Sequence, residues 1–253
     1  MKIFRKLMPG WGIVPVIIFL ILWEIVARIN LIFGHFFFPP FSIVVAEFYY
    51  LTVNGVLGKN FLSSFFRVLI GFSFGSIAGL LIGILMGWKS LIDKALNPII
   101  SLIYPIPALG WLPLLMLWLG IGEILPIAII FICSFFPILY NTSTGIKTVD
   151  KNYIRVAKSL GASDREILTS IVIPLALPNI FTGLKLESGM AWRVIIAAEM
   201  VAIPTGIGAL MMRAESLMRI DIIIVCLIVL AVMCFIFERF FLFLETRFTA
   251  RWS

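Results

Sequence analysis

The sequence predicts an all-α integral membrane protein with about six transmembrane helices and with both termini in the cytoplasm. Of its 253 residues, 62% are hydrophobic and the mean hydropathy is +1.13, whereas soluble domains are only ~45–50% apolar. Uncharged runs such as Val68–Trp88 (21 residues) and Ile124–Ile146 (23 residues) are long enough to cross a bilayer, which takes ~20 residues of α-helix. The distribution of Lys and Arg then sets the orientation.

The six predicted spans cover residues of about 10–28, 62–88, 95–119, 124–143, 179–203 and 221–243. The first is interrupted by Pro15 and Glu24. A signal peptide is an alternative for this segment, but no small-residue cleavage site follows it, so we interpret it as a retained anchor.

Lys and Arg accumulate in the cytoplasmic segments of membrane proteins. With the N-terminus placed inside, twelve of the 20 lie in inner segments and four in outer ones. The inner residues are Lys2, Arg5, Lys6, Lys89, Lys94, Lys147, Lys151, Arg155, Lys158, Arg165, Arg247 and Arg251; the outer ones are Arg28, Lys59, Arg213 and Arg219. The net charge of +7 therefore reflects topology, and we expect no nucleic-acid partner.

After the first span, Pro39-Pro40 predicts a short helix that begins at Ser42 and lies at the outer interface, with Tyr49 and Tyr50 at headgroup level. In the second span, small residues recur every four positions, at Gly71, Gly75, Gly79, Gly83 and Gly87. Such a ridge lets helix backbones approach closely in lipid. It predicts tight packing inside one subunit or, alternatively, a dimer contact.

The third block cannot be one straight helix, because Pro105-Ile106-Pro107 removes backbone donors from its middle. Broken backbone at membrane depth survives only where it is buried in protein or lines a cavity. Pro105, Pro107 and the following Trp111 are therefore candidates for a substrate pathway, with a simple kink in the bundle as the alternative.

A charged segment separates the fourth and fifth spans. Helical spacing over Val149–Leu160 places Tyr153, Val156, Ala157 and Leu160 on one apolar face. Gly161 ends this helix as a C-terminal cap, and Ser163 with Glu166 forms a capping box for a second helix that we expect to end at Pro174. The pattern predicts a helical hairpin that docks on another protein at the cytoplasmic face.

The fifth span carries polar residues inside the bilayer, which usually face a cavity or a partner. Lys185, Ser188, Trp192 and Glu199 fall within an arc of ~60° at 100° per residue. Arg193 lies ~100° from Trp192; it is interpreted either as an anion-attracting group on the pathway or as the ion-pair partner of Glu187 or Glu199. Arg67, near the outer end of the second span, is expected to snorkel to the surface.

The hairpin resembles the EAA loop of binding-protein-dependent ABC importer permeases, which follows the pattern EAA-x3-G-x9-I-x-L-P. The spacing holds throughout: Ala157, Gly161, Ile171 and Pro174 match the pattern, whereas the departures are Arg155 for Glu, Val156 for the first Ala and Ile173 for Leu. Arg155 reverses the charge of the family's Glu, so an ion pair made by that Glu is not carried over to this chain, and whether Arg155 alters coupling stays open. The stretches GWLPLLMLWLGIGE, SFFPILYNTSTGIKTVD, VAKSLGAS, LPNIFTGLKL and AWRVIIAAEM are similar to the nitrate/sulfonate/taurine/bicarbonate branch, and the similarity runs from about Pro39 to the C-terminus.

The resemblance implies a type I ABC importer permease-like fold: a single permease domain, residues 1–253, with a coupling loop at about 147–174, in the cell membrane of a prokaryote. It implies a small anionic solute, a second permease copy, two ATP-binding cassette subunits and an extracytoplasmic substrate-binding protein. ATP and Mg would bind to the partner ATPase, and no cofactor is expected to bind to this chain. The predicted coupling residues are Arg155, Val156, Ala157, Leu160, Gly161, Ser163, Glu166, Ile171 and Pro174; the predicted pathway residues are Pro105, Pro107, Trp111, Ser188, Trp192, Arg193 and Glu199.

Two other classes compete with this interpretation. A secondary transporter would typically show two related halves, and no convincing repeat is visible. A membrane anchor would leave the broken third block unexplained. The chain contains no GxxxxGK[ST] phosphate loop, no HExxH and no Ser/His/Asp set, so we expect neither ATP hydrolysis nor other catalysis by this chain.

Overall fold

The computed structural model describes residues 14–29 and 37–249, and these are almost entirely helical, with no strand among them. The elements in chain order are α1 (Val14–Ile29), α3 (Phe41–Val53), α4 (Val56–Trp88), α5 (Ser90–Ile103), η1 (Ala108–Trp111), α6 (Leu112–Leu119), α7 (Ile124–Lys147), α8 (Lys151–Ser159), α9 (Asp164–Ile167), η2 (Leu168–Val172), α10 (Ile173–Ala202), α11 (Ile207–Ser216) and α12 (Ile220–Thr249). The predicted all-α membrane fold is confirmed.

Within the described residues, four helical stretches are long and apolar enough to cross a membrane. They are α4, α7, the continuous stretch Asp164–Val201 and α12. A fifth span is possible if α5 and η1–α6 form one broken crossing, bent by 84°, as the prolines predict. The first predicted span corresponds to α1, whose described part has 16 residues; the start of that span lies outside the described residues.

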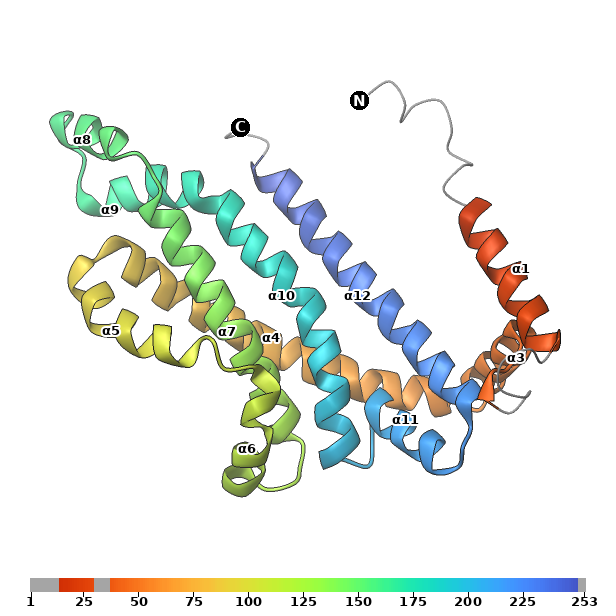
Figure 1. Ribbon diagram of the computed structural model, residues 1–253. Helices are drawn as coiled ribbons and strands as arrows, with labels where there is room; N and C mark the ends of the chain where they lie inside the picture. Colours follow the sequence, from red (N-terminus) through yellow and green to blue (C-terminus); the bar gives the residue numbers. More distant parts are fainter. Residues whose placement is uncertain (1–13, 30–36, 250–253) are drawn as a thin grey trace.

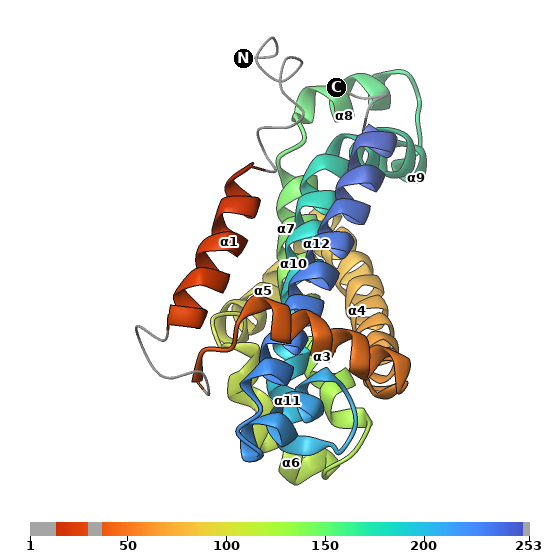
Figure 2. The ribbon, with the colours of Figure 1, turned by 90° about the vertical axis from the view of Figure 1, so that its right-hand side faces the viewer.

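The bundle has two distinct ends, separated by the lengths of α7, α10 and α12 (Figures 1 and 2). The α8–α9 segment lies at the same end as the last turns of α12. The opposite end carries α6 and α11. Helix α1 stands apart from the rest of the bundle and packs mainly on α3.

The glycine ridge of α4 packs against α7 in the same chain. A Cβ atom at Gly71, Gly75, Gly79 or Gly83 would lie 2.8 Å from a backbone oxygen of α7. Real Cβ atoms do not approach backbone oxygens so closely, so these positions require glycine. Of the two predicted uses of the ridge, packing inside one subunit is confirmed.

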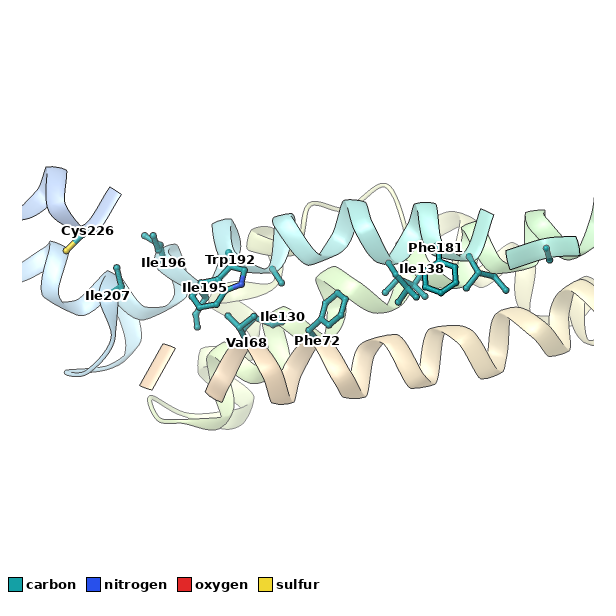
Figure 3. Close-up of a cluster of buried hydrophobic side chains, with 14 of the residues drawn as sticks. Val68, Phe72, Ile130, Ile138, Phe181, Trp192, Ile195, Ile196, Ile207 and Cys226 are labelled. Atoms are coloured by element: carbon teal, nitrogen blue, oxygen red, sulfur yellow. The ribbon is translucent and has the colours of Figure 1, made fainter. Parts of the chain in front are cut away.

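The apolar core lies between α4, α7 and α10 (Figure 3). Val68 and Ile130 are fully buried, and Trp192 of α10 is 2% exposed. The Trp192 ring packs against Phe237 of α12, with ring centroids 5.4 Å apart. This core fixes the relative positions of the three helices that carry the polar groups described below.

The expected end of a helix at Pro174 is wrong. The chain continues without a break from α9 through the π-turn η2 into α10, and Pro174 lies in the first turn of α10. In η2 the Ile173 amide donates to the Leu168 carbonyl, five residues back. Because a π-turn is wider than an α-turn, the proline ring avoids the carbonyl that would normally block it.

Candidate functional site

The α8–α9 hairpin is built from local capping interactions. The Asp150 carboxylate accepts a hydrogen bond from the Asn152 amide at the start of α8. At its end, Gly161 adopts φ +84°, and the Ala162 amide donates to the Ala157 carbonyl at 3.0 Å, a Schellman arrangement. The predicted glycine cap is therefore confirmed.

The capping box of the second helix is also present. The Glu166 amide donates to Ser163 Oγ at 3.3 Å, and the Ser163 amide donates to Glu166 Oε2 at 2.7 Å. Across the turn, Lys158 and Asp164 form an exposed ion pair at 3.2 Å. These short-range bonds hold two helices in a fixed hairpin that projects from one end of the bundle (Figure 1).

The hairpin exposes large apolar side chains. Tyr153, Val156 and Leu160 are 57%, 60% and 83% exposed. They border a groove of about 500 Å³ whose other walls come from Ala157, Ser170, Ile171 and Leu175. An exposed apolar patch of this kind marks a protein or membrane contact.

The predicted coupling residues differ in how far they are exposed. Ala157 lines the groove but is only 7% exposed, because most of it packs into the interior of the chain, and the neighbouring Ile167 of α9 is fully buried. Arg155, Gly161, Ser163 and Glu166 are exposed, whereas Ile171 and Pro174 are half-buried.

A cavity of about 290 Å³ lies where the third block is broken. One wall is the segment from Tyr104 to Leu109, which contains both Pro105 and Pro107. The other walls are α7 (Ile132, Cys133, Phe136 and Pro137) and α10 (Glu187, Met190 and Val194). Broken backbone thus borders a cavity, as membrane-depth loops must.

The remaining predicted pathway residues lie elsewhere. Trp111 is half-buried and is not part of the cavity wall. Ser188, Trp192 and Glu199 are buried on the core side of α10, so the arc expected to face a pathway faces the protein interior. Arg193 is exposed, and its guanidinium contacts Met190 Sδ at 3.5 Å.

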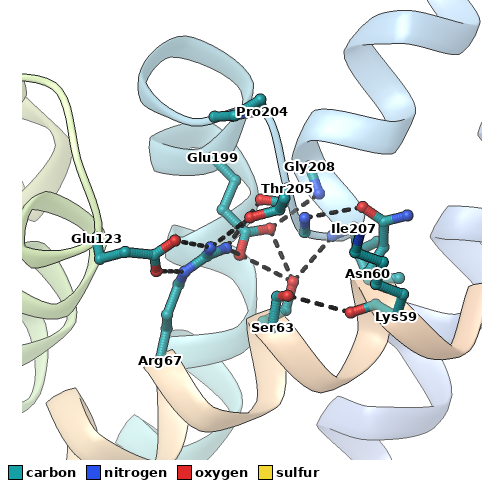
Figure 4. A network of polar contacts seen from close by, with 12 residues as sticks. Lys59, Asn60, Ser63, Arg67, Glu123, Glu199, Pro204, Thr205, Ile207 and Gly208 are labelled. Atoms are coloured by element: carbon teal, nitrogen blue, oxygen red, sulfur yellow. Dashed lines mark hydrogen bonds and ion pairs between the residues drawn. The ribbon is translucent and has the colours of Figure 1, made fainter.

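A buried polar network lies at the bundle end opposite the hairpin (Figure 4). Arg67 of α4 pairs with Glu199 of α10 at 2.6 Å and with Glu123, just before α7, at 2.6 Å. Its guanidinium also donates to the Thr205 carbonyl at 2.8 Å. Glu199 is fully buried, Arg67 is 3% exposed, and the hydrogen bond from Arg67 lowers the pKa of Glu123.

The same network fixes the loop between α10 and α11. Glu199 accepts hydrogen bonds from Ser64 Oγ and from the Gly208 amide at 3.0 Å. The Gly206 amide donates to Asn60 Oδ1 at 2.9 Å. Gly206 has φ +115°, and a Cβ there would overlap the Glu199 carboxylate, so this close approach requires glycine. We call the set around Arg67, Glu123 and Glu199, which lies at the end predicted to face outward, the outer network.

The outer network overturns two expectations. Arg67 does not snorkel to the surface, and Glu199 pairs with Arg67 rather than with Arg193. Among the described residues Arg193 forms no ion pair with Glu187 or Glu199 either. One signal for the correct pair was present: Arg67 and Glu199 have opposite charges and lie near the same predicted outer ends of their spans, where a charge needs a partner.

Sequence comparison identifies close similarities. The profile of the family described as "Binding-protein-dependent transport system inner membrane component" matches residues 75–250. A taurine transport system permease of Escherichia coli is 33% identical over 239 residues, covering 92% of this chain and 86% of the relative. A bicarbonate transport system permease of Synechocystis is 38% identical over 216 residues, covering 79% and 75%. A putative ABC transporter permease of Methanocaldococcus jannaschii is 38% identical, covering 82% and 78%.

The fold is also similar to a solved structure. It matches a chain of the MetNI methionine ABC transporter in an inward-facing conformation, with a TM-score of 0.59 and 16% sequence identity. The match covers 76% of this chain and 95% of that one. At this identity the likeness shows a shared fold.

Proposed function

The chain belongs to the family of inner-membrane components of binding-protein-dependent transport systems, and on that premise we propose that it imports a small anionic solute with energy from ATP hydrolysed by partner subunits. As a member of this family it is a multi-pass membrane permease and a transport subunit rather than an enzyme. The energy source, the stoichiometry and the solute form the proposal.

The α8–α9 hairpin is the observation that carries the proposal. Val156 and Leu160 expose apolar side chains beside a groove, on a hairpin whose own caps are complete. A rigid amphipathic helix of this kind suits insertion into a groove of another protein. We assign that partner as an ATP-binding cassette subunit, with ATP and Mg bound there, and place the hairpin in the cytoplasm with both termini.

The proposed complex contains two permease copies, two ATP-binding subunits and an extracytoplasmic binding protein. A pair of copies would cover the cavity wall from Tyr104 to Leu109, most of which is exposed in the single chain. The exposed Arg193, within a membrane-spanning helix, also needs cover by protein, because a charge facing lipid is costly. Both observations favour a homodimer.

The proposed solute class comes from the relatives. Permeases named for taurine, nitrate and bicarbonate are 33%, 36% and 38% identical to this chain. Oxyanions and organic acids as small as taurine, nitrate and bicarbonate fit a cavity of about 290 Å³. We therefore propose a small acid or oxyanion as the transported solute.

Reconstitution into liposomes tests the energy source. The permease is inserted with an ATP-binding subunit and a binding protein from the same organism, and uptake of radiolabelled taurine, nitrate and bicarbonate is measured with ATP. We expect uptake of one of them only when ATP can be hydrolysed, and none with an ATPase variant that cannot hydrolyse it. Uptake by the permease alone, driven by an ion gradient, would identify a secondary transporter instead.

A further inference from the structure

The cavity at the broken third block carries an acidic group that the transport of a bare anion does not explain. Glu187 of α10 forms part of its wall, and this carboxyl is accompanied there by no Lys, Arg or His among the described lining residues. An ionisable side chain inside a membrane protein marks a functional site by default. The groups that contact the Glu187 carboxyl therefore indicate which kind of ligand the cavity binds.

Glu187 has almost no partner inside the protein. It is 9% exposed, and its polar contact among the described residues is the Cys133 thiol, with Sγ and Oε2 3.8 Å apart. A thiol is a weak donor. None of the ion pairs of the described residues includes Glu187, in contrast to Glu199, which is paired and hydrogen-bonded.

The neighbouring backbone adds acceptors rather than donors. Pro137 has no amide hydrogen, so the carbonyl of Cys133 on the preceding turn of α7 lacks its usual helical donor. Pro105 and Pro107 remove two more donors from the facing wall. A carboxyl in a wall that is poor in backbone donors is suited to bind N–H donors of another molecule.

Arg193 does not alter this balance. It is not one of the lining residues and is exposed; its guanidinium contacts the sulfur of Met190, which does line the cavity, and Cys234 of α12. A bare inorganic anion in the cavity would therefore meet Glu187 with no Lys, Arg or His among the described lining residues, and like charges repel strongly in a medium of low dielectric constant.

We propose that Glu187 forms a subsite for a protonated amine, or another cationic N–H donor, of the transported solute. The inference rests on the proposed function, and it narrows the solute to an acid that also carries an amine, such as an aminosulfonate, rather than a bare oxyanion. The amine donates to the Glu187 carboxylate, while the acid group stays toward the open side of the cavity.

Charge-selective labelling of Cys133 tests the proposal on the full-length permease in liposomes. Cys226 and Cys234 are replaced by Ser, so that Cys133 is the only thiol left to react. The rate at which Cys133 is labelled is then measured with a cationic (ethylammonium) and with an anionic (ethylsulfonate) methanethiosulfonate. In each reaction the thiolate attacks the reagent's sulfenyl sulfur, methanesulfinate leaves and a mixed disulfide forms. Relative to the rate ratio with free cysteine, we expect about a tenfold preference for the cation.

Two matched variants show whether Glu187 causes the preference for the cationic reagent. Glu187→Gln should abolish it, whereas Glu238→Gln, the same change on an exposed residue of α12 outside the cavity wall, should keep it. An unchanged ratio in Glu187→Gln, a preference for the anion, or no labelling of Cys133 by either reagent overturns the proposal.

Protection from labelling tests the solute class. Taurine (2-aminoethanesulfonate) and ethanesulfonate differ only in the ammonium group. We expect taurine to slow the labelling of Cys133, ethanesulfonate to leave it unchanged, and Glu187→Gln to remove the difference. Equal effects of the two, including none, contradict the subsite. Because labelling needs neither ATP nor a binding protein, its outcome is separate from that of the uptake experiment.

Discussion

The two ends of the bundle differ in which side chains they bury and which they expose. At one end, Arg67 and Glu199 are buried and hydrogen-bonded to each other and to their neighbours. At the other end, the α8–α9 hairpin satisfies its backbone with caps but leaves Val156 and Leu160 exposed. The outer network is complete within one chain, whereas the hairpin presents a surface without a partner.

This difference separates structural groups from groups that await another protein. A buried ion pair that joins two helices fixes their arrangement, and removal of one partner is costly because the other charge stays buried. Exposed apolar residues on a rigid hairpin add nothing to the stability of the free chain. Substitutions at the two ends should therefore affect different measurements: unfolding at one end and association at the other.

The largest effect is expected for Arg67→Met. It leaves Glu199 buried without its cation, which costs about 3–5 kcal/mol. Thermal and denaturant unfolding of the purified permease in detergent should show the loss. Arg193→Met is the control, because Arg193 is exposed and forms no ion pair with any described residue; equal destabilisation by both variants would contradict the assignment. Adding Glu199→Gln to Arg67→Met should restore most of the stability.

At the hairpin, Leu160→Asp should weaken binding of the ATP-binding subunit by about 2 kcal/mol, the scale of an interface hot spot, or roughly 30-fold. Leu160 is 83% exposed, so unfolding of the free permease should not change. Co-purification shows whether the two proteins associate, and surface plasmon resonance gives the affinity of the permease for the ATP-binding subunit. Ser159→Asp, which adds the same charge at the preceding residue, is the control; equal losses for both would point to a general charge effect.

Gly161→Val should have a smaller effect that is confined to the hairpin. At φ +84° a β-branched residue is strained by about 1–2 kcal/mol, although nothing surrounds the position where its Cβ would lie. Hydrogen exchange of α8 amides should accelerate while global unfolding stays the same. Gly161→Asn tests the cause, since Asn tolerates this conformation; equal acceleration by Asn and Val would exclude backbone strain.

The same contrast explains what the sequence could predict. The hairpin was predictable because its signals are local: Gly161 and the Ser163–Glu166 capping box act over three to six residues, and both are confirmed. The Arg67–Glu199 pair joins residues 132 apart, and only their shared depth hinted at it. Helical periodicity correctly placed Ser188, Trp192 and Glu199 on one face of α10, but it could not show whether that face packs into the core or lines the cavity. The helix was wrongly expected to end at Pro174, because the π-turn that lets it continue has no clear sequence signal.

The smallest expected effect concerns Glu123, the one carboxylate of the outer network that is largely exposed, with 64% of its side chain accessible. Its hydrogen bond from Arg67 lowers its pKa, so the stability it contributes is complete above the pKa of an unfolded Glu, ~4.3, and is lost as the pH falls through the lowered value. Because solvent screens the pair, we expect less than about 1 kcal/mol. The thermal midpoints of wild type and Glu123→Gln should therefore differ at pH 7 and converge on acidification, while other carboxyl groups titrate equally in both. A difference that stays constant, or widens, as the pH falls would exclude Glu123 as a stabilising partner of Arg67 and leave Glu199 as the group that holds Arg67 in place.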